Sequence, residues 1–99
     1  MPHLIYSRNA VKDFNRLCDF LRKKDLRAAQ RAASAIYAGI EKILIEPRIG
    51  RPIKNMPHQY REWLIKFGAS GYVAKYYFDE ADDKVTVIAV KHQKENDYR

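Results

Sequence analysis

The sequence predicts an α+β domain in which an N-terminal strand and a helical hairpin pack on a small antiparallel sheet, in the order β-α-α-β-β-β. Residues 60–91 contain three runs rich in Tyr, Val, Ile, Phe, Trp and Thr, joined by the short turns GASG and EADD. Such runs are typical of an antiparallel meander. Residues 7–45 instead repeat apolar side chains at helical spacing. A chain of 99 residues with these features is expected to form a single domain, residues 1–99.

Two helices are expected between the first strand and the meander. The apolar run at residues 2–6 is long enough for one strand, and Ser7 after it is suited to cap a helix. Asp25 can cap a second helix, which must stop at Pro47 because proline cannot continue it. The short connection predicts an antiparallel hairpin over about residues 7–45. Its apolar stripe can be buried only against one face of the sheet.

The remaining segments are expected to connect these elements. Residues 46–59 hold three of the four prolines, which predicts a long extended connection. Gly68 and Gly71 bracket the first turn of the meander, residues 60–91, where a positive φ costs glycine little. The tail, residues 92–99, is too polar and short to fold by itself.

Composition excludes several classes of protein. No run is long enough for a transmembrane helix, the N-terminus does not resemble a signal peptide, and Cys18 alone cannot form an internal disulfide. A cytoplasmic protein is therefore expected. The formal charge is +7, and residues 8–31 carry eight basic and three acidic side chains, so +5 of the excess lies on the predicted helices. A basic surface of this kind suits nucleic acid, an anionic protein or simple solubility.

Neither face of any predicted strand is cleanly polar. Strict alternation predicts that one face of the last strand carries Thr86, Ile88, Val90 and His92. A mixture of aromatic and basic side chains is typical of a surface that a partner covers. The alternative is that the helices cover one face and the tail and the long connection cover the other.

Two residues could carry chemistry, and each also has a structural interpretation. Arg61 could clamp a phosphate or carboxylate, or form a salt bridge with Glu62 or an aspartate. His92 could act in acid–base catalysis, or it could be a structural side chain at a strand end. Trp63 and Tyr72 could stack on bases, although core positions suit them equally. The three histidines are too scattered to predict a metal site, and no phosphate-binding loop or nucleophile motif is present, so no cofactor is expected.

Several short motifs occur in an order that resembles the RelE/ParE superfamily of type II toxin–antitoxin toxins. They are the P-x-x-G-R-P loop at Pro47–Pro52, Arg61-Glu62, Gly71-Tyr72, and the ending V-x-H-x-x-E-x-x-Y from Val90 to Tyr98. The resemblance covers nearly the whole chain. It implies a toxin that is neutralised by a cognate antitoxin and is linked to plasmid or prophage maintenance.

The superfamily implies two different activities. RelE-like members are ribosome-dependent mRNA endonucleases, for which Arg61, His92 and Tyr98 would be the catalytic candidates. ParE-like members poison DNA gyrase by binding it and are not nucleases. Trp63 stands where the nuclease pattern would place a lysine, the expected arginine after the last strand is absent, and residues 61–99 carry no net charge. These departures favour the ParE-like activity, because a nuclease must stabilise developing phosphorane charge with clustered cations.

A third hypothesis is a non-toxic partner that acts only in a DNA-binding antitoxin complex. In each case the expected partners are an antitoxin and a macromolecular target, either gyrase or the ribosome with its mRNA, and operator DNA would be reached only through the antitoxin. The predicted partner-binding residues are Arg51, Arg61, Trp63, Tyr72, Lys75, Tyr77, Lys91, His92 and Tyr98.

Overall fold

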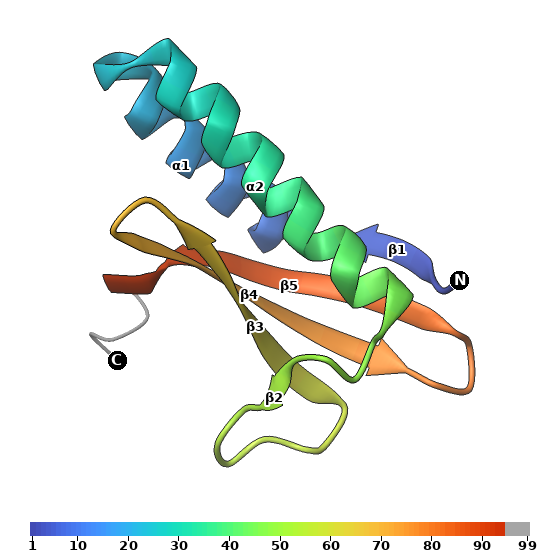
Figure 1. Ribbon diagram of the computed structural model, residues 1–99. Helices are drawn as coiled ribbons and strands as arrows, with labels where there is room; N and C mark the ends of the chain where they lie inside the picture. The colour runs from blue at the N-terminus through green and yellow to red at the C-terminus, as the bar shows by residue number, and fades with distance from the viewer. Residues whose placement is uncertain (95–99) are drawn as a thin grey trace.

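The computed structural model describes residues 1–94 and places two helices on one face of a five-stranded sheet (Figure 1). Its elements are β1 (His3–Tyr6), α1 (Arg8–Lys24), α2 (Leu26–Ile45), β2 (Arg51–Pro52), β3 (Tyr60–Phe67), β4 (Ser70–Asp79) and β5 (Lys84–His92). The strand order is β1-β5-β4-β3-β2. The predicted α+β class and element order are confirmed. The sheet is mixed, however, because β1 runs parallel to β5 while the other pairs are antiparallel.

The helical hairpin begins and turns at the two predicted caps. The Ser7 hydroxyl accepts a hydrogen bond from the Ala10 N–H at 3.0 Å and donates one to the Ile88 carbonyl at 2.8 Å, which ties the start of α1 to β5. Asp25 ends α1 and caps α2, because its N–H donates to the Leu21 carbonyl and its carboxylate accepts from the Arg27 N–H. Neither helix in residues 1–94 is long and apolar enough to cross a membrane.

The core lies between the hairpin and the sheet. α2 contributes Ile36, Ile40 and Ile43, each at most 2% exposed, and the sheet contributes a layer that consists of Ile65, Tyr72, Ala74, Tyr76, Val85, Val87 and Val90. Burial of large apolar side chains of this kind is the main stabilising contribution in a small domain. Cys18 is buried on α1, and desolvation raises the pKa of its thiol.

A bulge in β5 contradicts the strict alternation expected for this strand. Lys75 is paired with Ala89 but Tyr76 is paired with Val87, so Ile88 is an extra residue in β5. The extra residue reverses the alternation, and Val85, Val87 and Val90 are all buried under the helices.

Two other segments differ from the sequence-based expectations. Residues 46–59 were expected to be a connection without strands, but Arg51 and Pro52 form β2 and pair with β3. In the first turn of the meander only Gly68 has a positive φ, of 61°. Gly71 is required for a different reason, because a Cβ there would lie 2.3 Å from the Ile65 carbonyl oxygen.

Candidate functional site

The loop between α2 and β2 is held by two side chains of the sheet. The buried Tyr76 hydroxyl donates to the Pro47 carbonyl at 2.6 Å and accepts from the Gly50 N–H at 3.0 Å. Arg61 donates from Nη1 to the Gly50 carbonyl at 2.8 Å and to the Arg48 carbonyl at 3.4 Å. Burial raises the pKa of the Tyr76 hydroxyl, which keeps it protonated as the donor to Pro47. Arg61 therefore fixes backbone carbonyls of the loop, and its alternative as a partner of Glu62 is wrong.

The neighbouring acid, Glu62, instead binds Arg51. The Arg51 Nε donates to Glu62 Oε1 at 2.8 Å across the β2–β3 pair. The Glu62 side chain is only 10% exposed, whereas Arg51 is 58% exposed. Glu62 Oε2 is buried without a hydrogen-bond partner among residues 1–94. A carboxylate in this position opposes binding of a phosphate at Arg51.

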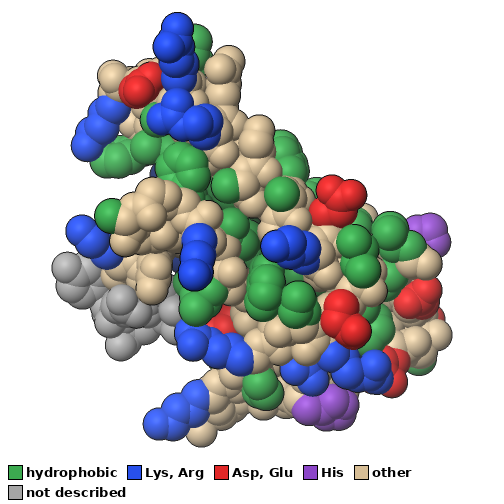
Figure 2. All heavy atoms as spheres, in the orientation of Figure 1, with side chains coloured by type: hydrophobic (Ala, Val, Ile, Leu, Met, Phe, Trp, Pro, Cys, Tyr) green, Lys and Arg blue, Asp and Glu red, His purple; other side chains and the backbone are tan. Residues whose placement is uncertain are grey.

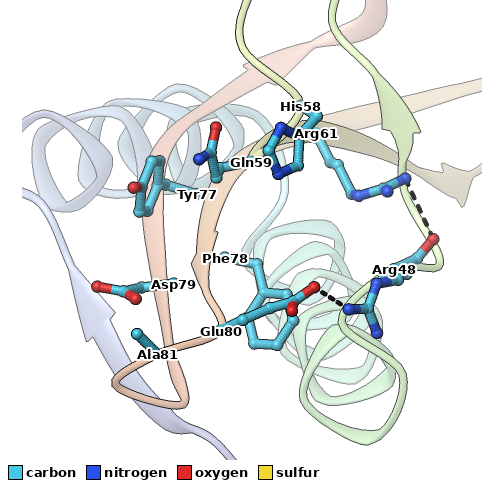
Figure 3. Close-up of a pocket in the computed structure, with 9 residues that line it drawn as sticks. All are labelled: Arg48, His58, Gln59, Arg61, Tyr77, Phe78, Asp79, Glu80 and Ala81. Atoms are coloured by element: carbon cyan, nitrogen blue, oxygen red, sulfur yellow. Dashed lines mark hydrogen bonds and ion pairs between the residues drawn. The ribbon is translucent and has the colours of Figure 1, made fainter.

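A polar pocket of about 220 Å³ lies beside this loop (Figure 3). Arg48, His58 and Arg61 line it, and Glu80 of the β4–β5 turn forms an ion pair with Arg48. Tyr77 also lines the pocket, and its ring packs edge-on against Tyr60, with 4.9 Å between the centroids. The pocket brings together two of the predicted site residues, Arg61 and Tyr77.

The other end of the sheet holds His92 in a different environment. The backbone N–H of Lys94 donates to His92 Nδ1 at 3.1 Å, so Nδ1 is an acceptor. Nε2 then carries the proton of the neutral ring and donates to the Ser70 hydroxyl at 3.0 Å. Tyr72 is 3% exposed and packs edge-on against the His92 ring at 5.7 Å. Tyr72 is thus a core residue. A partner could contact its ring, as predicted, only if the side chains packed around it moved away.

An apolar groove of about 690 Å³ separates α1 from the β3–β4 turn. It is lined by Leu17, Phe20, Leu21, Phe67, Tyr72 and His92, with Arg16 at its side. Phe20 is 58% exposed, and the Lys24 ammonium lies 4.5 Å from its ring centre. Figure 2 shows lysine and arginine side chains gathered at this end of the hairpin, where Arg22, Lys23 and Arg27 are exposed. The result is an apolar groove beside a basic helix end.

The remaining predicted residues are spread over both faces of the sheet. Lys75 is half-buried opposite Glu62 on the face that carries no helix. Lys91 reaches α1, where its ammonium pairs with Asp13 at 3.2 Å. Trp63 is half-buried beside α2. Tyr98 lies outside the described residues. Residues 1–94 contain no cluster of three His, Cys, Asp or Glu side chains that could hold a metal ion.

Comparison with known proteins identifies the family. The family described as the ParE toxin of type II toxin–antitoxin systems, parDE, matches residues 4–97. The chain belongs to the ParE toxin family. Within the RelE/ParE superfamily, this toxin is also similar to Toxin RelE1 of Caulobacter vibrioides, with 36% identity over 73 residues, which cover 74% of this chain and 75% of that protein.

Solved structures show that the fold of the ParE-family toxin is shared. A chain of the chromosomal ParDE system from P. aeruginosa matches with a TM-score of 0.71 and 13% identity, over 93% of this chain and 96% of that one. A chain of the intact E. coli RelBE toxin–antitoxin complex matches with a TM-score of 0.63 and 22% identity, over 92% and 95%. At these identities the likeness establishes the architecture.

Sequence reasoning missed two residues, Asp13 and Tyr76, whose side chains link separate elements near these sites by hydrogen bonds. Asp13 is 8% exposed, and its Oδ2 accepts a hydrogen bond from the Val90 N–H at 3.1 Å. β1 pairs with only four residues of β5, and Val90 lies beyond them. The Asp13 carboxylate therefore takes the place of a neighbouring strand at this part of the β5 edge. The available signal was an acidic residue at helical spacing from Ala10 and Leu17, on the buried stripe. Tyr76 carried no such signal, because nothing in the sequence showed that its hydroxyl would meet residues 47–50.

Proposed function

We propose that this toxin inhibits bacterial growth by binding and poisoning DNA gyrase, that it does not cut mRNA, and that a cognate antitoxin neutralises it. The observation that carries the proposal is the separation and prior engagement of the side chains that a nuclease would need. Cleavage of a phosphodiester requires an acid or base and several cations around one phosphate.

Arg61 and His92 do not line the same pocket, because Arg61 lies at the polar pocket and His92 at the apolar groove. Arg61 pairs with Tyr76 on β4, and His92 pairs with Tyr72 on the same strand. The two residues are four positions apart along the strand direction and two strands apart across the sheet. Their Cα atoms are therefore separated by roughly 16 Å. Both side chains are also engaged, Arg61 with loop carbonyls and His92 with Ser70 and the Lys94 N–H.

Two of the other predicted cations are also paired with acidic groups. Lys91 is paired with Asp13, and Arg51 with Glu62. A binding toxin does not need a concentrated positive field at one point, because it can distribute contacts over a surface. The exposed basic end of the hairpin and the apolar groove beside it suit an interaction with proteins.

The antitoxin partner is supported by the relatives in complexes. Two similar solved chains come from systems named ParDE and RelBE, the second described as a toxin–antitoxin complex. The 690 Å³ groove of this toxin offers a neutralising protein an apolar surface that solvent otherwise reaches.

A RelE-like endonuclease is the second candidate, and the polar pocket favours it. Arg48, His58, Arg61 and Tyr77 line that pocket together, as Figure 3 shows, and one curated relative is named Toxin RelE1. Asp79 and Glu80 line the same pocket and oppose the charge of a bound phosphate.

Replacement of His92 by glutamine tests the proposal in cells. The amide can retain hydrogen bonds at this position but cannot transfer protons, so we expect His92→Gln to keep growth inhibition within about threefold of the wild type, against losses of about 10²-fold or more for a lost acid–base group. Induction of the toxin and of the variant should both trigger the DNA-damage response. Gln93→Ala, at the neighbouring exposed position, is the matched control. Loss of toxicity in a folded His92→Gln protein, with mRNA cleavage by the wild type, would support the nuclease instead.

A further inference from the structure

The free end of the helical hairpin and the β3–β4 turn form two sides of the apolar groove. Both project toward the same side of the molecule (Figure 1), and the groove of about 690 Å³ lies between α1 and the turn. Leu17 and Phe20 line it from α1. Phe67 and Tyr72 line it from the sheet, with their ring centroids 5.9 Å apart. An apolar lining and a volume of roughly 300–1,000 Å³ are typical of sites that bind small molecules.

The polar side chains inside the groove are few, and two of them bind each other. His92 Nε2 donates to the Ser70 hydroxyl at 3.0 Å, and His92 Nδ1 accepts from the Lys94 N–H. A ligand that carried amide groups or a nucleobase into this lining would exchange hydrogen bonds with water for apolar contacts, which is unfavourable. An alkyl chain has no such groups to satisfy. The lining therefore favours an alkyl chain.

The charges beside the groove are positive. Arg16 lines it with a side chain that is 48% exposed, and no aspartate or glutamate of residues 1–94 lines it. Asp13 offsets part of the charge of Arg16, at 3.7 Å. Within the same residues the Lys24 ammonium contacts the Phe20 ring, 4.5 Å from its centre, rather than a carboxylate. An anionic head group at this end of the groove is therefore attracted.

We infer that the groove between α1 and the β3–β4 turn binds a free fatty acid. The alkyl chain lies against Phe20, Phe67 and Tyr72, and the carboxylate lies at Arg16 and Lys24. Burial of the chain supplies the affinity, and the two cations select the sign of the head group. The inference does not depend on which target the toxin inhibits. A bound fatty acid would occupy the apolar surface that the proposed function offers to the antitoxin.

The test is a titration of the whole protein with octanoate and decanoate, followed by calorimetry and by NMR. Each buried methylene should strengthen binding by about threefold, so decanoate should bind about tenfold more tightly than octanoate. We expect shift changes at the amides of Phe20, Ala69 and Ser70. Decyltrimethylammonium has the same chain with a cationic head group and should bind at least about tenfold more weakly than decanoate.

Two pairs of variants provide matched comparisons. Ala69→Trp, at an exposed lining position of the β3–β4 turn, places a ring in the groove and should weaken decanoate binding by about tenfold. Ala81→Trp, exposed in the β4–β5 turn and outside the groove lining, should leave it unchanged. Lys24→Gln should weaken decanoate by about threefold but not decyltrimethylammonium, whereas Lys23→Gln, exposed at the same helix end, should have a smaller effect.

Four results would each overturn the inference. They are equal affinities for octanoate and decanoate, equal binding of the cationic amphiphile, shift changes confined to another surface, and decanoate binding that a folded Ala69→Trp protein retains in full. An acidic amphipathic helical peptide provides the remaining comparison. If this peptide shifted the Phe20 and Ala69 amides while millimolar decanoate left them unchanged, the groove would belong to a protein partner, and the inference would again be wrong.

Discussion

Replacement of Asp13 by alanine is expected to lower the free energy of unfolding by about 2–3 kcal/mol. The variant leaves the Val90 N–H without its acceptor at the edge of β5 and the Lys91 ammonium without its partner. For a domain of this size the loss corresponds to a decrease in Tm of roughly 10–15 °C. Thermal and urea unfolding followed by circular dichroism measure both quantities.

The matched control for Asp13 is an aspartate on the same helix. Asp19 pairs with Arg22 at 2.9 Å, but both side chains are about 60% exposed. Asp19→Ala should therefore cost less than about 1 kcal/mol. Equal losses for the two variants would show that the Asp13 contact to β5 is not what stabilises this edge.

Replacement of Tyr76 by phenylalanine is the second change with a large expected effect, a loss of about 2–3 kcal/mol. The ring stays in the core, but the Pro47 carbonyl loses its donor and the buried Gly50 N–H loses its acceptor. We expect faster hydrogen exchange at Gly50 and neighbouring loop amides as well as a lower Tm. Tyr77→Phe, at a half-buried position on the other face, should change stability by less than about 0.5 kcal/mol.

The contribution of the Tyr76 hydroxyl to stability should decrease at alkaline pH. Because burial raises the pKa of Tyr76 above 10.0 in the folded state, the unfolded chain releases this proton first as the pH rises. The stabilising contribution is therefore complete below about pH 10 and decreases as the pH passes through the folded pKa. Burial also raises the pKa values of Tyr6 and Tyr72, so Tyr76→Phe should reduce the alkaline loss of stability without abolishing it. An unchanged alkaline profile would contradict this role.

The sequence predicted the parts of the fold that depend on local patterns. Ser7 and Asp25 cap the helices as expected, and the meander turns where Gly68 and the EADD segment indicated. The parallel pairing of β1 could not be predicted, because it joins residues more than 75 positions apart. The bulge at Ile88 could not be predicted either, because it is a register shift between β4 and β5 that the alternation within β5 does not show.

The candidate site was harder to predict than the fold. Alternation placed Arg61 and Trp63 on one face correctly, but it could not show that the guanidinium of Arg61 would be occupied by loop carbonyls. Tyr72 and His92 looked available for a partner until the structure placed their rings together beside Phe67 and α1. These hydrogen bonds and ring contacts arise from tertiary packing, which the residue pattern of a single strand does not show.

Gyrase supercoiling with the purified toxin tests the central claim most directly. Relaxed plasmid, gyrase and ATP are mixed with toxin, and relaxed, supercoiled and cleaved DNA are quantified, with ribosome-dependent mRNA cleavage measured in parallel. The proposed function predicts inhibited supercoiling or trapped cleaved DNA that excess antitoxin reverses, with intact mRNA. Unaffected gyrase and cut mRNA from a toxin that still stops growth would contradict it.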